Sequence, residues 1–264
     1  MRVPSVEEQL ARARRRAGGK GRRRATMDQF WEPGHLAAVT FTVVAGAGLV
    51  VAARRAPGTW LTWVRISLAV ALIANQTVYS MRGLWEQNWS IRYDLPLNLC
   101  DVAAFVAGGA LLLGRRWWVE TAYFWAMAGS TMGLLFPDTT LPTLSYGYLE
   151  YYIDHAGVIL AALLLVGGLR QVPEAGAYRR ALTTILGYAA LVGMFDVITG
   201  ANYFTLRAKQ SAATLTPLGL LSPWPWYIPE AGLIAMAALG VLALPFHRGT
   251  STLARPPIGG VPAT

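Results

Sequence analysis

The sequence is poor in cysteine and in charge. Its 264 residues include a single cysteine, Cys100, which excludes an intrachain disulfide framework and a cysteine-rich metal site. Charged residues make up 14% of the chain, against about 25% in an ordinary soluble domain. The sequence has no glycine-rich phosphate-binding loop and no cluster of metal-ligand residues. We therefore expect no nucleotide, coenzyme or metal cofactor.

Apolar residues replace the missing charge. They amount to 54% of the chain, with ten Trp and eleven Tyr, a composition typical of multi-pass membrane proteins. We predict an all-α membrane bundle of about seven helices, each long enough to cross the roughly 30 Å hydrocarbon core. The expected spans are approximately residues 35–53, 60–79, 95–113, 117–136, 152–169, 179–199 and 229–246.

The net charge of +9 does not indicate a nucleic-acid-binding protein. Nine of the 23 Lys and Arg residues lie in the first 24 positions, and most others stand in short loops between apolar runs. We expect residues 1–26 to form a disordered basic tail and residues 249–264 a flexible tail. Between them, residues 27–248 form the seven-helix domain, and Met27 is the expected natural start.

The loop charges predict an orientation. The loops after spans 1, 3 and 5 and the C-terminal tail carry nine Arg residues, whereas the other three loops carry four basic residues. Because positive loops stay in the cytoplasm, we expect a plasma-membrane protein with its N-terminus outside and its C-terminus inside. Counting the basic tail would reverse this orientation, and we give the short loops more weight because they constrain every span.

Polar residues gather at one end of the predicted bundle. Starts of odd spans and ends of even spans share one side of the membrane, and embedded polar groups there usually mark a site. The sequence therefore predicts a polar pocket, on the outer face in this orientation. Its candidate residues are His35, Glu86, Asn98, Cys100, Asp101, Asp138, Asp154, His155, Asn202, Tyr203, Trp224 and Trp226.

The stretch 95-LPLNLCD-101 places a thiol at the head of an apolar span. We expect Asp94 to cap this helix, so that Cys100 lies in its first turns, where the helix N-terminus favours a thiolate. His155 is expected at comparable depth and would accept the thiol proton. We predict about 3–6 Å between the Cys100 sulfur and a His155 ring nitrogen.

Three further residues would support the Cys100–His155 pair, and purely structural roles are the alternative for all of these side chains. Asn98, Asp101 or Asp154 would orient the imidazole or bind an oxyanion. A lone cysteine is more often an apolar filler, and an interfacial histidine more often a polar contact. Asn202 and Tyr203 would then only order a loop, and the tryptophans of 223-PWPWY-227 would form an interfacial belt.

Five stretches in a fixed order resemble the YwaF-like family of bacterial integral membrane proteins, over roughly residues 27–246. They are LPLNLCD, YFWAMAGSTMGLLFPD, YYIDH, GANYFTL and PWPWY. This family is similar to an animal transmembrane acyltransferase family that remodels ether phospholipids with a cysteine and a histidine. The resemblance implies that Cys100, within 98-NLCD-101, and His155 are catalytic, and that a membrane phospholipid or lysolipid is the partner.

Three functions remain open from the sequence. The first is a Cys–His transacylase, which requires the thiol. The second is a transporter or binding protein for lipids or small molecules, which would tolerate replacement of Cys100. The third is a structural membrane protein in which the polar cluster only fixes the register of the helices.

Overall fold

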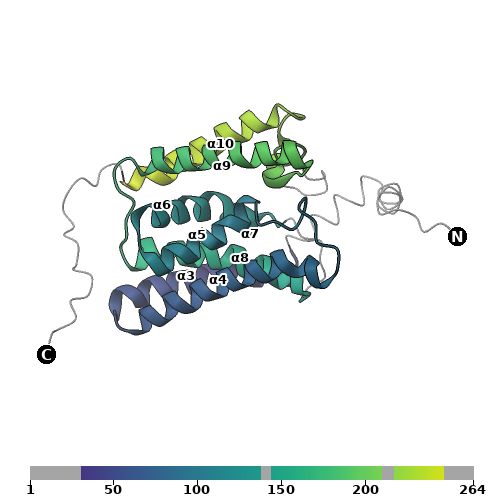
Figure 1. Cartoon of the computed structure of the whole chain (residues 1–264). Coiled ribbons are helices and arrows are strands. Elements are labelled where there is room, and N and C mark those ends of the chain that lie inside the picture. The colour runs from purple at the N-terminus through teal and green to yellow at the C-terminus, as the bar shows by residue number, and fades with distance from the viewer. Residues whose placement is uncertain (1–30, 138–143, 210–216, 247–264) are drawn as a thin grey trace.

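The computed structural model describes residues 31–137, 144–209 and 217–246, and within these ranges the chain is an all-α bundle, as predicted (Figure 1). Five of its helical stretches are long and apolar enough to cross a membrane. The shorter α5 and the continuous run of α6, η1 and α7 complete the seven. The seven stretches are α3 (Pro33–Arg55), α4 (Trp60–Trp85), α5 (Leu99–Leu113), α6–η1–α7 (Arg116–Trp125, Ala126–Ser130 and Thr131–Leu135), α8–η2 (Tyr146–Ala162 and Leu163–Gly168), α9 (Ala177–Thr199) and α10–η5 (Tyr227–Ala243 and Leu244–Phe246).

Helix α8 is the central element of the bundle. It packs against α3, α4, α5, α6 and α7. In the most apolar part of the span formed by α8 and η2, 67% of the residues are buried inside the bundle. The corresponding share in the other four long spans is 17–22%. Figure 1 shows α9 and α10 side by side, on the opposite side of the bundle from α3 and α4. This pair reaches the other helices chiefly through α6 and η1.

Glycines let the helices around α8 approach closely. A Cβ at Gly108 of α5 would lie 2.7 Å from Ile73 of α4, and one at Gly157 of α8 would lie 2.8 Å from Leu72. Apolar burial does little to associate helices in lipid, so close packing of small residues takes its place.

Helix α5 begins four residues later than predicted. Its N-cap is Asn98 and not Asp94, whose carboxylate instead accepts a hydrogen bond from the backbone of Ser90 at 2.7 Å. Residues 95–97 stay outside the helix because distant side chains bind their backbone. The Tyr203 hydroxyl accepts from the N–H of Leu95 at 2.9 Å, and the Tyr188 hydroxyl donates to the Leu97 carbonyl at 2.6 Å.

Helix α8 begins six residues earlier than predicted. Ser145 is its N-cap, with the hydroxyl accepting the N–H of Tyr148 at 3.3 Å. Asp154 and His155 therefore lie inside the helix and do not open it, which corrects the prediction. Both side chains are buried.

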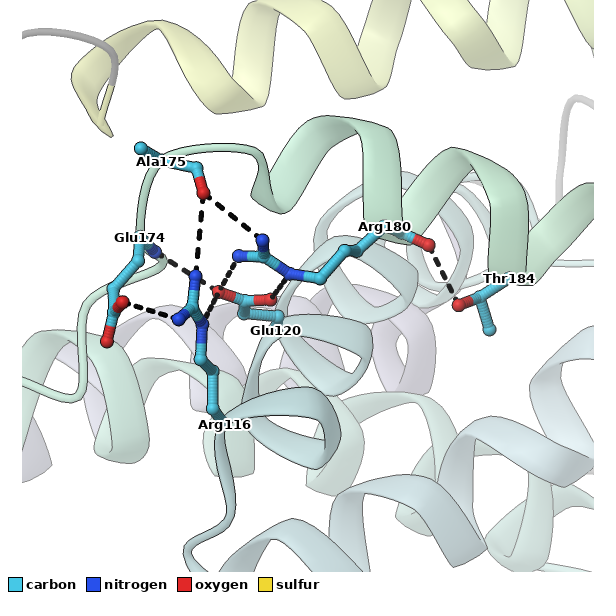
Figure 2. Close-up of polar contacts among 6 residues, drawn as sticks. All are labelled: Arg116, Glu120, Glu174, Ala175, Arg180 and Thr184. Atoms are coloured by element: carbon cyan, nitrogen blue, oxygen red, sulfur yellow. Dashed lines mark hydrogen bonds and ion pairs between the residues drawn. The ribbon is translucent and has the colours of Figure 1, made fainter.

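A buried carboxylate fastens α6 to α9 (Figure 2). The Glu120 side chain is 4% exposed and accepts two hydrogen bonds from Arg180 at 2.7 Å each. It also accepts from Arg116 at 3.2 Å and from the backbone N–H of Glu174 at 3.1 Å. The cluster therefore ties the start of α6 to the loop before α9 and to the first turns of α9.

We predict that Glu120→Gln destabilises the protein by about 1–3 kcal/mol, because it replaces charge-assisted hydrogen bonds by weaker ones and turns an amide donor toward two arginines. Unfolding in detergent micelles measures the change. The matched control is Glu86→Gln, in an exposed pair with Arg82 at 3.3 Å, where a loss below about 1 kcal/mol is expected. Equal losses would mean that the Glu120 cluster has no special role in stability.

Candidate functional site

Asn98 and Asp101 close the first turn of α5. The Asp101 carboxylate accepts the backbone N–H of Asn98 at 3.1 Å and its side-chain amide at 2.9 Å. The Asn98 side-chain oxygen, Oδ1, accepts the backbone N–H of Phe204 at 3.2 Å. Both residues thus hold the helix start against the loop after α9, and this is a positioning role.

Cys100 is the second residue of α5 and is a free, half-buried thiol. The backbone N–H groups of a first helical turn have no partner inside the helix, so they can stabilise negative charge. The carboxyl groups of Asp101, Glu150 and Asp154 all lie within electrostatic range of the thiol. Among the described residues, no group of three or more His, Cys, Asp and Glu residues could hold a metal ion.

Glu150 and Asp154 are four residues apart on α8, and both are buried. The side-chain amide of Asn75 on α4 donates to the backbone carbonyl of Glu150 at 3.3 Å, which places α4 beside this turn of α8. One carboxylate oxygen of Asp154, Oδ1, is buried without a hydrogen-bond partner in the described part of the chain. Sequence reasoning missed Glu150, although its four-residue spacing from Asp154 would have indicated a shared helix face.

His155 has a defined tautomer. Its Nδ1 lies 2.8 Å from the backbone carbonyl of Tyr151. A carbonyl only accepts hydrogen bonds, so Nδ1 carries the proton and Nε2 of the neutral ring keeps a lone pair. The ring also stacks on the Tyr151 ring, with centroids 4.1 Å apart. His155 is therefore oriented as a base that would act through Nε2.

Gly133 of α7 makes room for the His155 ring. A Cβ at this position would lie 2.4 Å from Nε2 and 2.3 Å from Cδ2 of His155. The Tyr151 hydroxyl donates to the Gly133 carbonyl at 2.6 Å and so fixes the same contact from the other side. Sequence reasoning missed Gly133 and Tyr151. The four-residue spacing of Tyr151 from His155 could have indicated Tyr151, and no signal in the sequence indicated Gly133.

Helices α5 and α8 are packing neighbours, as a Cys–His pair requires. Cys100 lies at the start of one, and His155 lies inside the other. Between them, α5 and α8 also bring Asp101 and Asp154 into electrostatic range of the thiol. The distance of about 3–6 Å between the sulfur and a ring nitrogen stays a prediction.

The loop after α9 is ordered by the residues that the sequence singled out. The Tyr203 hydroxyl donates to the carbonyl of Ile91 at 3.0 Å, in addition to its contact with Leu95. The Asn202 side-chain oxygen accepts the N–H groups of Arg207 and Ala208 at 2.8 and 2.9 Å. These contacts agree with the loop-ordering role considered for both residues.

The other candidates lie on α3, at the end of α4 and before α10, and their part in a pocket stays a prediction. His35 of α3 is buried, and its Nδ1 lies 3.0 Å from the Tyr152 hydroxyl on α8. Glu86 is the exposed C-cap of α4. Trp224 and Trp226 precede α10 and are 58% and 68% exposed, as expected for side chains in a membrane interface. Asp138 and the predicted tails 1–26 and 249–264 lie outside the described residues.

The fold defines an integral membrane protein with several apolar spans, and the central helix α8 carries three buried ionisable side chains, Glu150, Asp154 and His155. The sequence model of the TMEM164 family matches residues 30–243, and the chain belongs to this family of membrane proteins. No curated protein and no solved structure matches the chain. The more specific resemblance to YwaF-like proteins stays a prediction.

We predict that Gly133→Ala displaces the His155 ring and destabilises the protein by about 1–3 kcal/mol, because the added methyl overlaps Nε2. The matched control is Gly187→Ala in α9, where a Cβ meets nothing within 4 Å and the change should be neutral or stabilise by up to about 1 kcal/mol. Thermal unfolding in micelles measures both variants. A Gly133→Ala protein as stable as the control would contradict the close contact.

Proposed function

We propose that the protein is a membrane acyltransferase that moves an acyl chain between lipids through a thioester on Cys100. The observation that carries this proposal is the tautomer of His155, whose Nδ1–H is bound to the Tyr151 carbonyl and whose Nε2 is left as a base. The packing of α8 against α5, which carries the only thiol of the chain, supports the same function. The resemblance to acyltransferases that use a cysteine and a histidine agrees with it.

The proposed reaction has two halves. In the first, the Cys100 sulfur attacks the ester carbonyl of a phospholipid while His155 Nε2 takes the thiol proton. The new C–S bond is kept, the ester C–O bond breaks, and Nε2 returns the proton to the leaving lysolipid hydroxyl. In the second, a lysolipid hydroxyl gives its proton to Nε2 and attacks the thioester carbonyl. A new ester C–O bond forms, the C–S bond breaks, and Nε2 returns the proton to the sulfur, which restores the thiol. No oxidant or cofactor enters this balance.

The carboxyl groups near Cys100 disfavour a thiolate when they are charged, which affects when the thiol would lose its proton. Asp101, Glu150 and Asp154 are its electrostatic neighbours, and any negative charge on them repels a permanent thiolate. The helix N-terminus opposes this repulsion only in part. We therefore propose that the proton leaves Cys100 during the attack and does not leave beforehand, so that the reaction depends on the histidine.

We predict that wild-type protein in lipid bilayers, incubated with an alkyne-tagged phospholipid, forms an acyl adduct that hydroxylamine removes. Cys100→Ala should abolish the adduct, because it removes the nucleophile. His155→Ala should slow its formation by about 10²–10⁴-fold, because it removes the base. Labelling and mass spectrometry of the tryptic peptide measure both effects.

The adduct experiment needs a second readout, because a short-lived thioester would escape detection. Movement of the label from phospholipid to added lysolipid provides it. If wild type and Cys100→Ala transfer the label equally, or if neither transfers it, the proposal of thiol catalysis is wrong.

A binding or transport function is the second candidate. It is favoured by three carboxyl groups within electrostatic range of one another, Asp101 of α5 and Glu150 and Asp154 of α8. One of them, Asp154, has a buried oxygen without a described partner. Buried carboxyl groups often lie along ion or substrate paths in membrane proteins. Such a protein would keep its activity in Cys100→Ala and lose it in Asp154→Asn, the reverse of the order expected for thiol catalysis.

We also propose that the protein lies in the plasma membrane with this site on the outer face, because the arginine-rich loops lie at the other end. In a Cys100→Ala background, Tyr93→Cys and Arg115→Cys place single thiols at exposed positions of the two ends. A membrane-impermeant maleimide should label the Tyr93→Cys variant on intact cells and the Arg115→Cys variant only after lysis. The opposite pattern would reverse the orientation.

A further inference from the structure

Ser130 carries a buried hydroxyl that its own helix does not satisfy. The side chain is 1% exposed, and its Oγ has no hydrogen-bond partner in the described part of the chain. Buried serine and threonine hydroxyls usually bond to the carbonyl four residues earlier in the same helix. Among the described residues, five threonines do so at 2.6–3.0 Å, namely Thr42, Thr77, Thr183, Thr184 and Thr199.

A π-helical turn explains the exception. Residues 126–130 form the π-helix η1, in which the backbone N–H of Thr131 binds the carbonyl of Ala126. The Thr131 hydroxyl donates to the same carbonyl at 3.1 Å. Ala126 is the residue four positions before Ser130, so its oxygen already has two donors. Single π-helical turns inside α-helices are frequent at functional sites.

Residues close to Ser130 in the sequence contact both helices of the proposed catalytic pair. Gly129 lies against Leu99, the residue before Cys100, because a Cβ at Gly129 would be 3.4 Å from the Leu99 side chain. Gly133 shares a helix face with Ser130 and lies against His155. Leu134, on the same face, packs with Tyr148 and Tyr152 of α8. Ser130 therefore faces α8, close in depth to the first turn of α5.

We propose that the Ser130 hydroxyl donates a hydrogen bond to the carbonyl oxygen of the lipid ester that Cys100 attacks. When the C–S bond forms, the π electrons of the carbonyl move onto that oxygen, and a fixed donor stabilises the resulting negative charge. When the ester C–O bond breaks, the charge returns to the carbonyl. This role rests on the proposed acyl transfer, and it gives the unpartnered hydroxyl a ligand of defined chemistry, an ester carbonyl.

The test compares Ser130→Ala with wild type in the phospholipid adduct experiment, over a range of tagged lipid concentrations. The rate of adduct formation at saturating lipid should fall about 100-fold, whereas the half-saturating concentration should stay the same, because the bond forms only as charge develops. The matched control is Thr42→Val, which removes a buried helical hydroxyl that is satisfied within its own helix, and it should label at the wild-type rate.

Thermal unfolding separates this role from a structural one. Ser130→Ala breaks no hydrogen bond within the described residues, so its unfolding midpoint should not fall. A wild-type rate of labelling, or a rate that falls only together with the unfolding midpoint, would overturn the role of Ser130 and leave acyl transfer intact. A wild-type protein that forms no adduct and transfers no label would overturn acyl transfer and this role together.

Discussion

The position of α8 is the constraint on which the rest of the structure depends. Lipid offers no hydrogen-bond partners, so polar side chains in a span must face protein. Glu150, Asp154 and His155 all lie on α8, and all three are buried. Only a helix surrounded by others can carry them. The glycines that bring α4 close to α5 and to α8 follow from this demand, because any gap would leave these groups exposed to the hydrocarbon.

The place where α5 begins is set by segments far away in the sequence. Tyr188 and Tyr203 bind the backbone of residues 95–97, and Phe204 binds the side chain of Asn98. The helix therefore starts where the loop after α9 allows it to start. The orientation of His155 has a local cause, the carbonyl of Tyr151 one turn earlier, and a distant one, the absence of a side chain at Gly133. Cys100 and His155 thus both depend for their positions on residues that take no part in the proposed reaction.

Hydropathy and loop chemistry were sufficient to predict the bundle, because each apolar run ends at Arg, Gly or Pro. They were not sufficient to predict the residues at which α5 and α8 begin. Asp94 and Asn98 are equally good caps by residue type, and the tyrosines that decide between them lie about a hundred residues later. Ser130 and Gly133 could not be singled out either, because in 128-AGSTMG-133 they read as small packing residues. The unpartnered hydroxyl of Ser130 depends on a π-helical turn, and the contact at Gly133 depends on the His155 ring from another helix. Neither feature leaves a periodic signal in the sequence.

The central place of α8 also bears on how the protein is made. Chains leave the ribosome from the N-terminus, so α3 to α7 are synthesised before α8. The span with the most buried acidic and basic side chains thus follows α4, α5 and α7, against which it packs, and these helices are available to receive it. If it had to insert first, its carboxyl groups would meet only lipid. The order of the helices along the chain thus spares the nascent protein a costly intermediate, and α9 and α10 then cover a centre that is already formed.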